Sequence, residues 1–204
     1  MSSRPPLILL IEDDPALRTM LRGILELHDF MVMEAEQREA GLTLLRKHPE
    51  IAIVILDFGL PPHIHQITEG IATLRAIQVE VMTVKVIVLT GQDQQAAALE
   101  AIREGAFDFI AKPASTEAIL NSVRRAMLFL DKEDELGREG ITRIAINAQI
   151  GDGLKSVRAD AEERVVRQIL KETGFNINQS AKRLGVKREN IYYFLKKFGI
   201  HRDD

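Results

Sequence analysis

Five short runs of apolar residues punctuate the first 115 residues of this chain, and their spacing limits the folds that it can adopt. The runs are residues 7–11, 30–33, 51–56, 84–90 and 107–111. Between them lie longer stretches with apolar residues at helical spacing, such as Leu17, Leu21 and Ile24. Near-continuous Ile/Val/Leu strands that alternate with amphipathic helices are typical of a parallel sheet covered on both faces. The pattern therefore predicts an α/β fold with a doubly wound, five-stranded parallel sheet.

Polar residues follow the predicted strands at the edge where such a sheet binds its ligands. In chain order they are Glu12-Asp13-Asp14, Asp57, Thr90 and Lys112-Pro113. Carboxylates that converge on one point repel one another unless a hard cation such as Mg²⁺ neutralises them. A lysine and a hydroxyl beside them suit the oxygens of a phosphoryl group. The set predicts an aspartyl nucleophile, a metal ion and two contacts to a phosphoryl oxyanion.

Each of these residues also has a simpler interpretation. Asp14 precedes Pro15, a pair typical of a helix N-cap followed by proline at the first helical position, so we leave Asp14 out of the metal site. Glu12 alone is compatible with a solvated strand end, and Lys112 alone with a loop. Asp57 is harder to explain without a role, because it directly follows six apolar residues.

Charge divides the chain into an acidic N-terminal part and a basic C-terminal part. Residues 1–130 hold 12 Lys/Arg against 17 Asp/Glu, a net charge of −5, whereas residues 174–202 hold seven against one, a net charge of +6. This split favours a chemical module joined to a module that contacts a polyanion. We predict domains at residues 5–131 and 159–204, with a linker at residues 132–158 in which residues 141–150 form a brief apolar run.

Several classes of protein are disfavoured by composition. The chain has no cysteine, which excludes a disulfide framework and a thiolate metal site. No stretch approaches the roughly 20 apolar residues of a membrane span, so we expect a cytoplasmic protein with no membrane partner. The segment GDGLKS in the linker lacks the glycine spacing of a nucleotide-binding loop.

The acidic series and the segment GAFDFIAKP at residues 105–113 resemble the receiver domain of two-component response regulators. The resemblance covers roughly residues 5–130 and implies a flavodoxin-like fold. It also implies that a sensor histidine kinase phosphorylates Asp57, and that the chain is no enzyme beyond its own phosphotransfer and autodephosphorylation chemistry. The implied roles are Mg²⁺ binding by Asp13, Asp57 and the Gly59 backbone carbonyl with Glu12 assisting, phosphoryl contacts by Thr90 and Lys112, and a switch comprising Thr90 and Phe109.

One loop departs from the receiver pattern. Receivers usually place a glycine about four residues after the proline that follows the phospho-acceptor, whereas here Gly70 lies about five residues later than that. The loop contains His63 and His65, but two histidines with no third ligand nearby are more typical of a solvated loop than of a metal site.

The C-terminal residues carry three helical patterns. Residues 161–173 have a wide apolar face, which favours burial against a second copy of the chain. Asn178 is the expected N-cap of a short helix that ends at Leu184, and a third helix is expected from Arg188 to Phe198, closed by Gly199. Two helices joined by a short glycine turn, with basic residues on the second, are typical of a helix-turn-helix. A three-helix bundle with solvated lysines is the alternative.

The string NINQSAKRLGVKRENIYYFLKKFGI, within residues 173–200, is similar to the Fis-type DNA-binding domain of NtrC-family activators. The resemblance implies double-stranded DNA as a partner. Lys187 departs from it by replacing the usual polar N-cap, and Glu189, Tyr193 and Phe194 stand at positions that are commonly basic. The candidate DNA contacts are Lys182, Lys187, Arg188, Glu189, Tyr192, Tyr193, Lys196 and Lys197.

The ATPase domain that NtrC-family activators carry between these two modules is missing. The leading hypothesis is therefore a transcriptional regulator that binds DNA as a homodimer when phosphorylated, without ATP-driven remodelling of polymerase. The alternative is an interaction module whose C-terminal domain modulates another activator without binding DNA. The departures in the last helix favour that alternative, and the +6 charge disfavours it.

Overall fold

A computed structural model describes residues 6–62, 66–80, 83–91, 94–139, 141 and 154–201. His63, His65 and nearly all of the apolar run at residues 141–150 lie outside the described residues. The chain divides into two compact units, residues 1–141 and 142–204. Within the described part of the chain, no helix is both long and apolar enough to span a bilayer.

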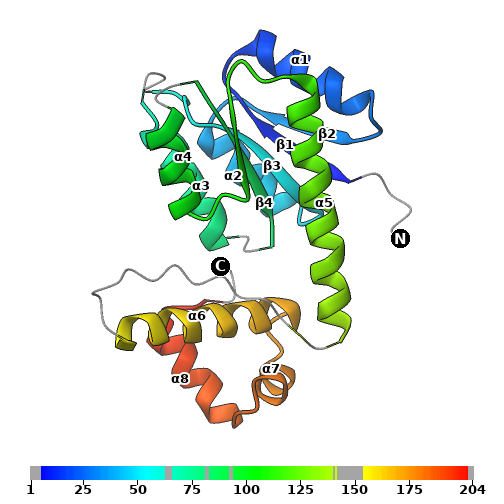
Figure 1. Cartoon of the computed structure of the whole chain (residues 1–204). Coiled ribbons are helices and arrows are strands. Elements are labelled where there is room, and N and C mark those ends of the chain that lie inside the picture. The colour runs from blue at the N-terminus through cyan, green and yellow to red at the C-terminus, as the bar shows by residue number, and fades with distance from the viewer. Residues whose placement is uncertain are drawn as a thin grey trace. The chain divides into compact units, whose positions relative to one another are not determined.

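The N-terminal unit is built on a five-stranded parallel sheet with strand order β2-β1-β3-β4-β5 (Figure 1). This sheet confirms the predicted α/β fold, and each strand coincides with one of the five apolar runs to within two residues. The strands are β1 (Leu7–Ile11), β2 (Met31–Ala35), β3 (Ile51–Asp57), β4 (Lys85–Thr90) and β5 (Asp108–Ala111).

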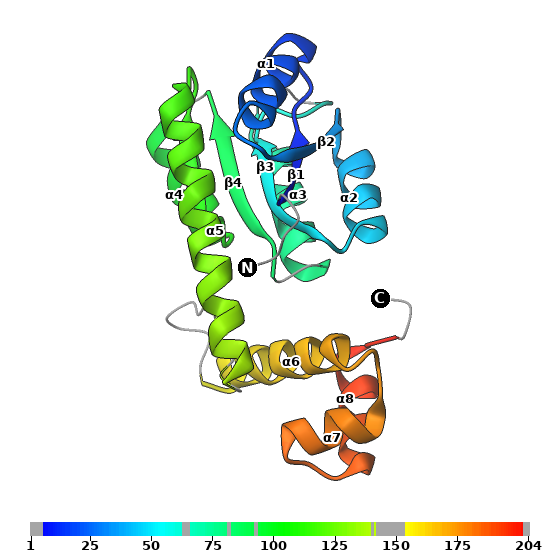
Figure 2. The same ribbon diagram turned by 90° about the vertical axis from the view of Figure 1, so that its right-hand side faces the viewer.

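Helices cover both faces of the sheet (Figure 2). Helices α1 (Pro15–Glu26) and α5 (Thr116–Arg138) pack on the face to which Ile8 and Leu10 point. The opposite face is covered by α2 (Arg38–Lys47), α3 (Thr68–Glu80) and α4 (Gln94–Arg103). Because successive strand residues point to opposite faces and both faces are buried, the strands read as continuous apolar runs.

Helix α5 is longer than the sequence predicted. The linker was expected to begin at residue 132, but the helix continues to Arg138. Two contacts hold the second half of α5 near the sheet. Lys85 Nζ lies 2.6 Å from a carboxylate oxygen of Glu133, and the rings of Phe107 and Phe129 meet edge to face with centroids 5.5 Å apart. Both contacts join residues distant in sequence, so local periodicity gave no sign of them.

The C-terminal unit contains α6 (Leu154–Glu172), α7 (Ile177–Leu184) and α8 (Arg188–Phe198) around a small apolar core. The predicted bounds of α8 are confirmed, and Gly185 and Gly199 end α7 and α8 with φ of 66° and 59°. This left-handed backbone carries little cost for glycine, which has no Cβ. The core comprises Val166, Leu170, Ala181, Ile191, Phe194 and Ile200.

The predicted N-cap of α7 is wrong. Asn176 caps the helix, with its side-chain oxygen accepting from the Gln179 backbone N–H at 3.2 Å, while Asn178 lies in the first turn and is exposed. The two asparagines are two residues apart and both suit a cap by residue type. The turn after α6, in which Gly174 and Phe175 have φ of 58° and 59°, brings Asn176 rather than Asn178 to the helix start.

Candidate functional site: an acidic pocket at the sheet edge and the outer face of helix α8

The carboxyl ends of the central strands bring the sequence-predicted acidic residues together. Glu12 and Asp13 directly follow β1, and Asp57 is the last residue of β3, its neighbour in the sheet. The strand order runs from β1 to β2 on one side and to β3 on the other, so the winding of the chain reverses at this point. Such a reversal leaves an open crevice at the sheet edge, which is where doubly wound sheets bind ligands.

Lys112 links the two buried carboxylates. Its Nζ donates to Glu12 Oε2 at 2.8 Å and lies 3.1 Å from Asp57 Oδ2. Lys112 follows β5, two strands away from β3, and is 100 residues from Glu12 in sequence. The ammonium group is therefore positioned beside the predicted nucleophile by the tertiary fold.

Asp57 is held by contacts to both of its oxygens. Only 5% of the residue is exposed, Oδ1 accepts from the Gly59 backbone N–H at 3.1 Å, and Oδ2 faces Lys112. The carboxylate is thus oriented by an ammonium group and a backbone N–H, and it is the predicted nucleophile.

Burial makes Glu12 an unusual acid. The residue is 1% exposed, and its pKa is raised from 4.5 to about 7, first by burial and then by repulsion from Asp57, with the hydrogen bond from Lys112 acting in the opposite direction. Glu12 therefore binds a proton more readily than an exposed glutamate does.

Glu12, Asp13 and Asp57 form a group that fits a divalent cation. One carboxylate oxygen from each lies within 4.8 Å of the others. All three donors are oxygens, which Mg²⁺ prefers, and a cation among them would relieve the repulsion between Glu12 and Asp57. Asp14 has the separate role that its sequence context predicted: its Oδ1 accepts from the backbone N–H groups of Ala16 and Leu17 and caps α1.

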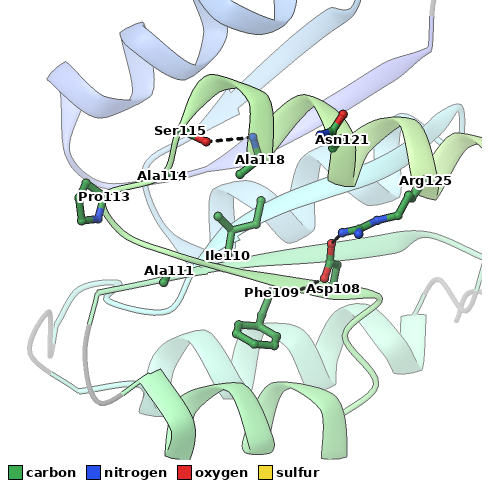
Figure 3. A pocket seen from close by; sticks show the side chains of 10 residues that line it. All are labelled: Asp108, Phe109, Ile110, Ala111, Pro113, Ala114, Ser115, Ala118, Asn121 and Arg125. Atoms are coloured by element: carbon green, nitrogen blue, oxygen red, sulfur yellow. Dashed lines mark hydrogen bonds and ion pairs between the residues drawn. The ribbon is translucent and has the colours of Figure 1, made fainter.

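Thr90 and Phe109 lie on neighbouring strands beside this pocket. Thr90 ends β4 and is 1% exposed, whereas Phe109 on β5 is 37% exposed. The Phe109 ring points away from α5, toward the face of the sheet that α4 covers (Figure 3). A threonine at the carboxyl end of β4 and a partly exposed aromatic ring on β5 thus stand on paired strands.

The edge strand β5 also lines a feature that the sequence pattern did not predict. An open depression of about 510 Å³ lies between β5 and the start of α5, and Asp108 and Arg125 form an ion pair at one end of it (Figure 3). Asp108 Oδ2 also accepts from the buried Ser122 hydroxyl at 2.5 Å. The sequence did contain one indication of this feature, because Asp108 is an acidic residue inside the short apolar run at residues 107–111.

All eight candidate DNA-contacting residues are exposed on α7, α8 or the turn between them. Some of them already have partners. Lys197 Nζ lies 2.5 Å from Glu162 Oε2 on α6, and an Arg188 terminal nitrogen donates to the Tyr192 hydroxyl at 3.1 Å. Phe194, which stands at a commonly basic position, is buried in the core and stacks on Phe198 with centroids 6.1 Å apart.

Comparison with known proteins identifies both units. Residues 8–124 match the response regulator receiver domain family. The chain belongs to the response regulators. Residues 157–198 match the Fis family of bacterial regulatory proteins, so the second unit is a Fis-type helix-turn-helix domain. Only residues 125–156 separate the two matches, which leaves no room for an ATPase domain between them.

Relatives and solved structures place this response regulator among receiver proteins with different outputs. It is 34% identical over 121 residues to the C4-dicarboxylate transport transcriptional regulatory protein DctD of Pseudomonas aeruginosa, covering 59% of this chain and 25% of that protein. It is 31% identical over 121 residues to the chemotaxis protein CheY of Listeria monocytogenes, covering 58% of this chain and 96% of CheY. The chain thus spans about a quarter of the former relative and nearly all of the latter.

The solved structures support the fold. The signal receiver domain of a LuxO repressor protein from Vibrio parahaemolyticus superposes with a TM-score of 0.58 at 23% identity, covering 65% of this chain and 97% of that one. NtrX from Brucella abortus superposes with a TM-score of 0.60 at 23% identity, covering 79% of this chain and 34% of that one.

Proposed function

We propose that a sensor histidine kinase phosphorylates this response regulator on Asp57, and that phosphorylation promotes binding of double-stranded DNA by a homodimer. The observation that carries the phosphorylation step is the contact of Lys112 with both Asp57 and Glu12 in a buried acidic pocket. That arrangement combines a nucleophile, a cation for the incoming phosphoryl oxygens, and a set of carboxylates suited to Mg²⁺.

The proposed chemistry is phosphoryl transfer from a phosphohistidine. An oxygen of Asp57 attacks the phosphorus, a P–O bond forms, and the P–N bond to the imidazole breaks. Mg²⁺, held by Asp13, Asp57 and the Gly59 carbonyl with Glu12 assisting, would neutralise charge on the transferring group. Lys112 and the Thr90 hydroxyl would contact phosphoryl oxygens, since both lie at the same sheet edge as Asp57.

The added phosphoryl charge would be communicated along β4 and β5. A phosphoryl group carries about −1.5 to −2 charge, so Thr90 and Lys112 would shift toward it. Lys112 follows β5, and Phe109 lies on that strand with its ring at the surface. A shift of β5 would therefore alter the face formed by α4, β5 and α5, where Leu99 and Ile102 expose apolar side chains. Burial of this face against a second copy would bring two copies of α8 together.

The basic helix α8 supports DNA as the partner of the second unit. Ile191 and Phe194 anchor α8 in the core, which leaves Arg188, Tyr192 and Lys196 along its exposed side. A helix with arginine in its first turn and lysines further along is suited to the major groove and the flanking phosphates.

Two linked experiments test the proposal. Phosphodonor and Mg²⁺ should label the wild-type chain once and leave Asp57→Asn unlabelled. Gel shifts with genomic DNA fragments, in the presence and absence of beryllofluoride as a phosphoryl mimic, should show tighter binding with the mimic for the wild type only. Labelling of Asp57→Asn, or equal binding in both conditions, would contradict the proposed gating.

An interaction module is the second candidate function. The pairing of Lys197 with Glu162 reduces the positive charge that α8 presents, which favours this candidate. Here the C-terminal unit would bind another activator and modulate it without contacting DNA. This function would be supported instead if the phosphorylated wild-type chain shifts no genomic fragment although its C-terminal unit is folded.

A further inference from the structure

Helix α8 carries an interaction within its exposed face that the receiver chemistry and the helix-turn-helix fold do not require. Arg188 and Tyr192 are four residues apart, one helical turn, and both are exposed. A terminal guanidinium nitrogen of Arg188 donates to the Tyr192 hydroxyl at 3.1 Å, and the guanidinium carbon lies 5.9 Å from the centre of the Tyr192 ring.

We infer that Tyr192 is a positioning residue that holds Arg188 in the orientation that reads a guanine in the major groove, so that Tyr192 sets the sequence specificity of DNA binding. This inference rests on the proposed DNA-binding function. It assigns Tyr192 an effect that acts through Arg188, distinct from any phosphate contact.

Arg188 can contact a base while its side chain is hydrogen-bonded to Tyr192. A guanidinium group has five N–H donors and two edges from which paired donors can reach the O6 and N7 acceptors of guanine. Both edges include the terminal nitrogen that contacts Tyr192, but each uses a different proton of it. Whichever proton the tyrosine accepts, one complete edge remains for the base.

Holding the side chain favours binding because a free arginine loses much rotamer freedom when it is ordered on a base. Tyr192 has few rotatable bonds and stands on a helix that Ile191 and Phe194 anchor in the core. The tyrosine is thus a rigid support for a flexible side chain. Disordering Arg188 should reduce discrimination between base pairs, and should leave the contacts of the lysines with phosphates unchanged.

Tyr193 offers a matched control for the mobility of Arg188. It is exposed to a similar extent, 58% against 50% for Tyr192, and is the next residue on the same helix. Its ring meets Phe194 edge to face and lies under Lys197, so its contacts are with other residues than Arg188. Tyr192→Phe and Tyr193→Phe each delete one hydroxyl and keep the ring.

The test measures how strongly the protein discriminates between base pairs. Duplexes selected from a random pool by the wild-type chain are compared with the same duplexes after replacement of single guanines. We expect Tyr192→Phe to reduce the preference for one guanine by about three- to tenfold, the range for loss of one hydrogen bond of ordinary net strength. The salt dependence of binding should be the same in Tyr192→Phe as in the wild type.

A double-mutant cycle separates positioning from direct contact. If Tyr192 acts through Arg188, Tyr192→Phe should have no further effect on discrimination in an Arg188→Ala background. NMR relaxation of the Arg188 Nε–H group in the free chain should also show greater mobility in Tyr192→Phe than in Tyr193→Phe.

The outcomes distinguish this inference from the proposed function. Unchanged discrimination in Tyr192→Phe, additive effects in the cycle, or equal weakening on all sequences would overturn the positioning role and leave DNA binding intact. Absence of DNA binding by the wild-type chain would overturn the proposed function and the specificity role together.

Discussion

At the scale of single residues, three adjacent acids after β1 have three environments. Glu12 points into the pocket, where Lys112 contacts it, and burial raises its pKa to about 7. Asp13 contributes to the candidate metal site, and Asp14 caps α1. Successive residues at a strand end point in different directions, so neighbours in sequence take different chemical roles.

Because Asp13 and Asp14 have different roles, their replacement should affect different properties of the receiver. Asp14→Ala should destabilise the receiver by about 1 kcal/mol, the usual cost of losing an N-cap, and should keep Mg²⁺ affinity within about twofold. Asp13→Ala should weaken Mg²⁺ binding by about tenfold or more, since even groups that only orient metal ligands affect affinity to that extent. Calorimetric Mg²⁺ titration and urea unfolding measure the two effects. Equal losses of Mg²⁺ affinity in both variants would refute this assignment.

Glu12 should make the receiver less stable as pH rises in metal-free buffer. A carboxyl group whose pKa rises on folding stabilises the fold fully below its unfolded pKa of 4.5, and this contribution is lost as pH rises through its folded value of about 7. The loss between pH 4.5 and pH 8 is at most about 3 kcal/mol.

Glu12→Gln removes this titrating group and should flatten the dependence. The urea dependence of hydrogen exchange in peptides from β1 and β3 gives the free energy of receiver unfolding at each pH. The same pH dependence in Glu12→Gln and in the wild type would show that the Glu12 carboxyl does not titrate in this range.

At the scale of elements, the C-terminal end of α7 is set by a local glycine, whereas its N-terminal end also depends on contacts with the end of α6. Gly185 ends the helix by adopting a left-handed conformation, and Asn176 starts it through a side-chain hydrogen bond. The buried Ser180 hydroxyl lies 2.6 Å from that of Thr173 and also donates to the Asn176 carbonyl. These bonds fix the approach of α7 to the end of α6, and with it the position of the cap.

The two asparagines near this helix start should therefore differ in importance. Asn176→Ala should destabilise the C-terminal unit by about 1 kcal/mol, and Asn178→Ala, an exposed first-turn change, by less than about 0.5 kcal/mol. Hydrogen exchange of α7 peptides measures both. A larger effect of Asn178→Ala would restore the cap position that the sequence suggested.

The two lysines near the end of α8 should also differ in DNA binding. Lys197 is paired with Glu162 and lies 4.8 Å from the centre of the Phe198 ring, whereas Lys196 is exposed beside it. Lys196→Ala should lower the slope of log affinity against log salt by about one unit. Lys197→Ala should lower it less, because Glu162 already compensates its charge. Fluorescence anisotropy at several salt concentrations measures the slopes, and equal decreases would contradict the difference.

At the scale of the whole molecule, the chain joins a receiver to a helix-turn-helix unit with no ATPase domain between them. The purified protein should therefore neither hydrolyse ATP nor open a promoter that depends on the nitrogen-type alternative sigma factor. A coupled-enzyme ATPase assay and in vitro transcription measure these activities. ATP turnover that copurifies with the chain through successive columns, and persists in Asp57→Asn, would disprove the expectation.

The sequence by itself determined the features that depend on neighbouring residues. Apolar runs predicted the strands of the sheet because a strand buried on both faces must be apolar throughout. The Asp14-Pro15 pair predicted a helix start, and Gly185 and Gly199 predicted helix ends, because caps and left-handed turns involve only a few consecutive residues. Resemblance then indicated both families from motifs at these positions.

Only the tertiary structure decided which distant side chains meet. Lys112 contacts Glu12 across 100 residues, and Lys197 pairs with Glu162 across 35 residues. The sequence pattern of each element does not indicate which other element it will contact. Phe194 belongs to the core because of the angle at which α8 packs, although its neighbour Tyr193 is exposed. Local patterns specify elements, whereas packing and long-range electrostatics specify their partners. The charge that each site presents is therefore a property of the folded chain.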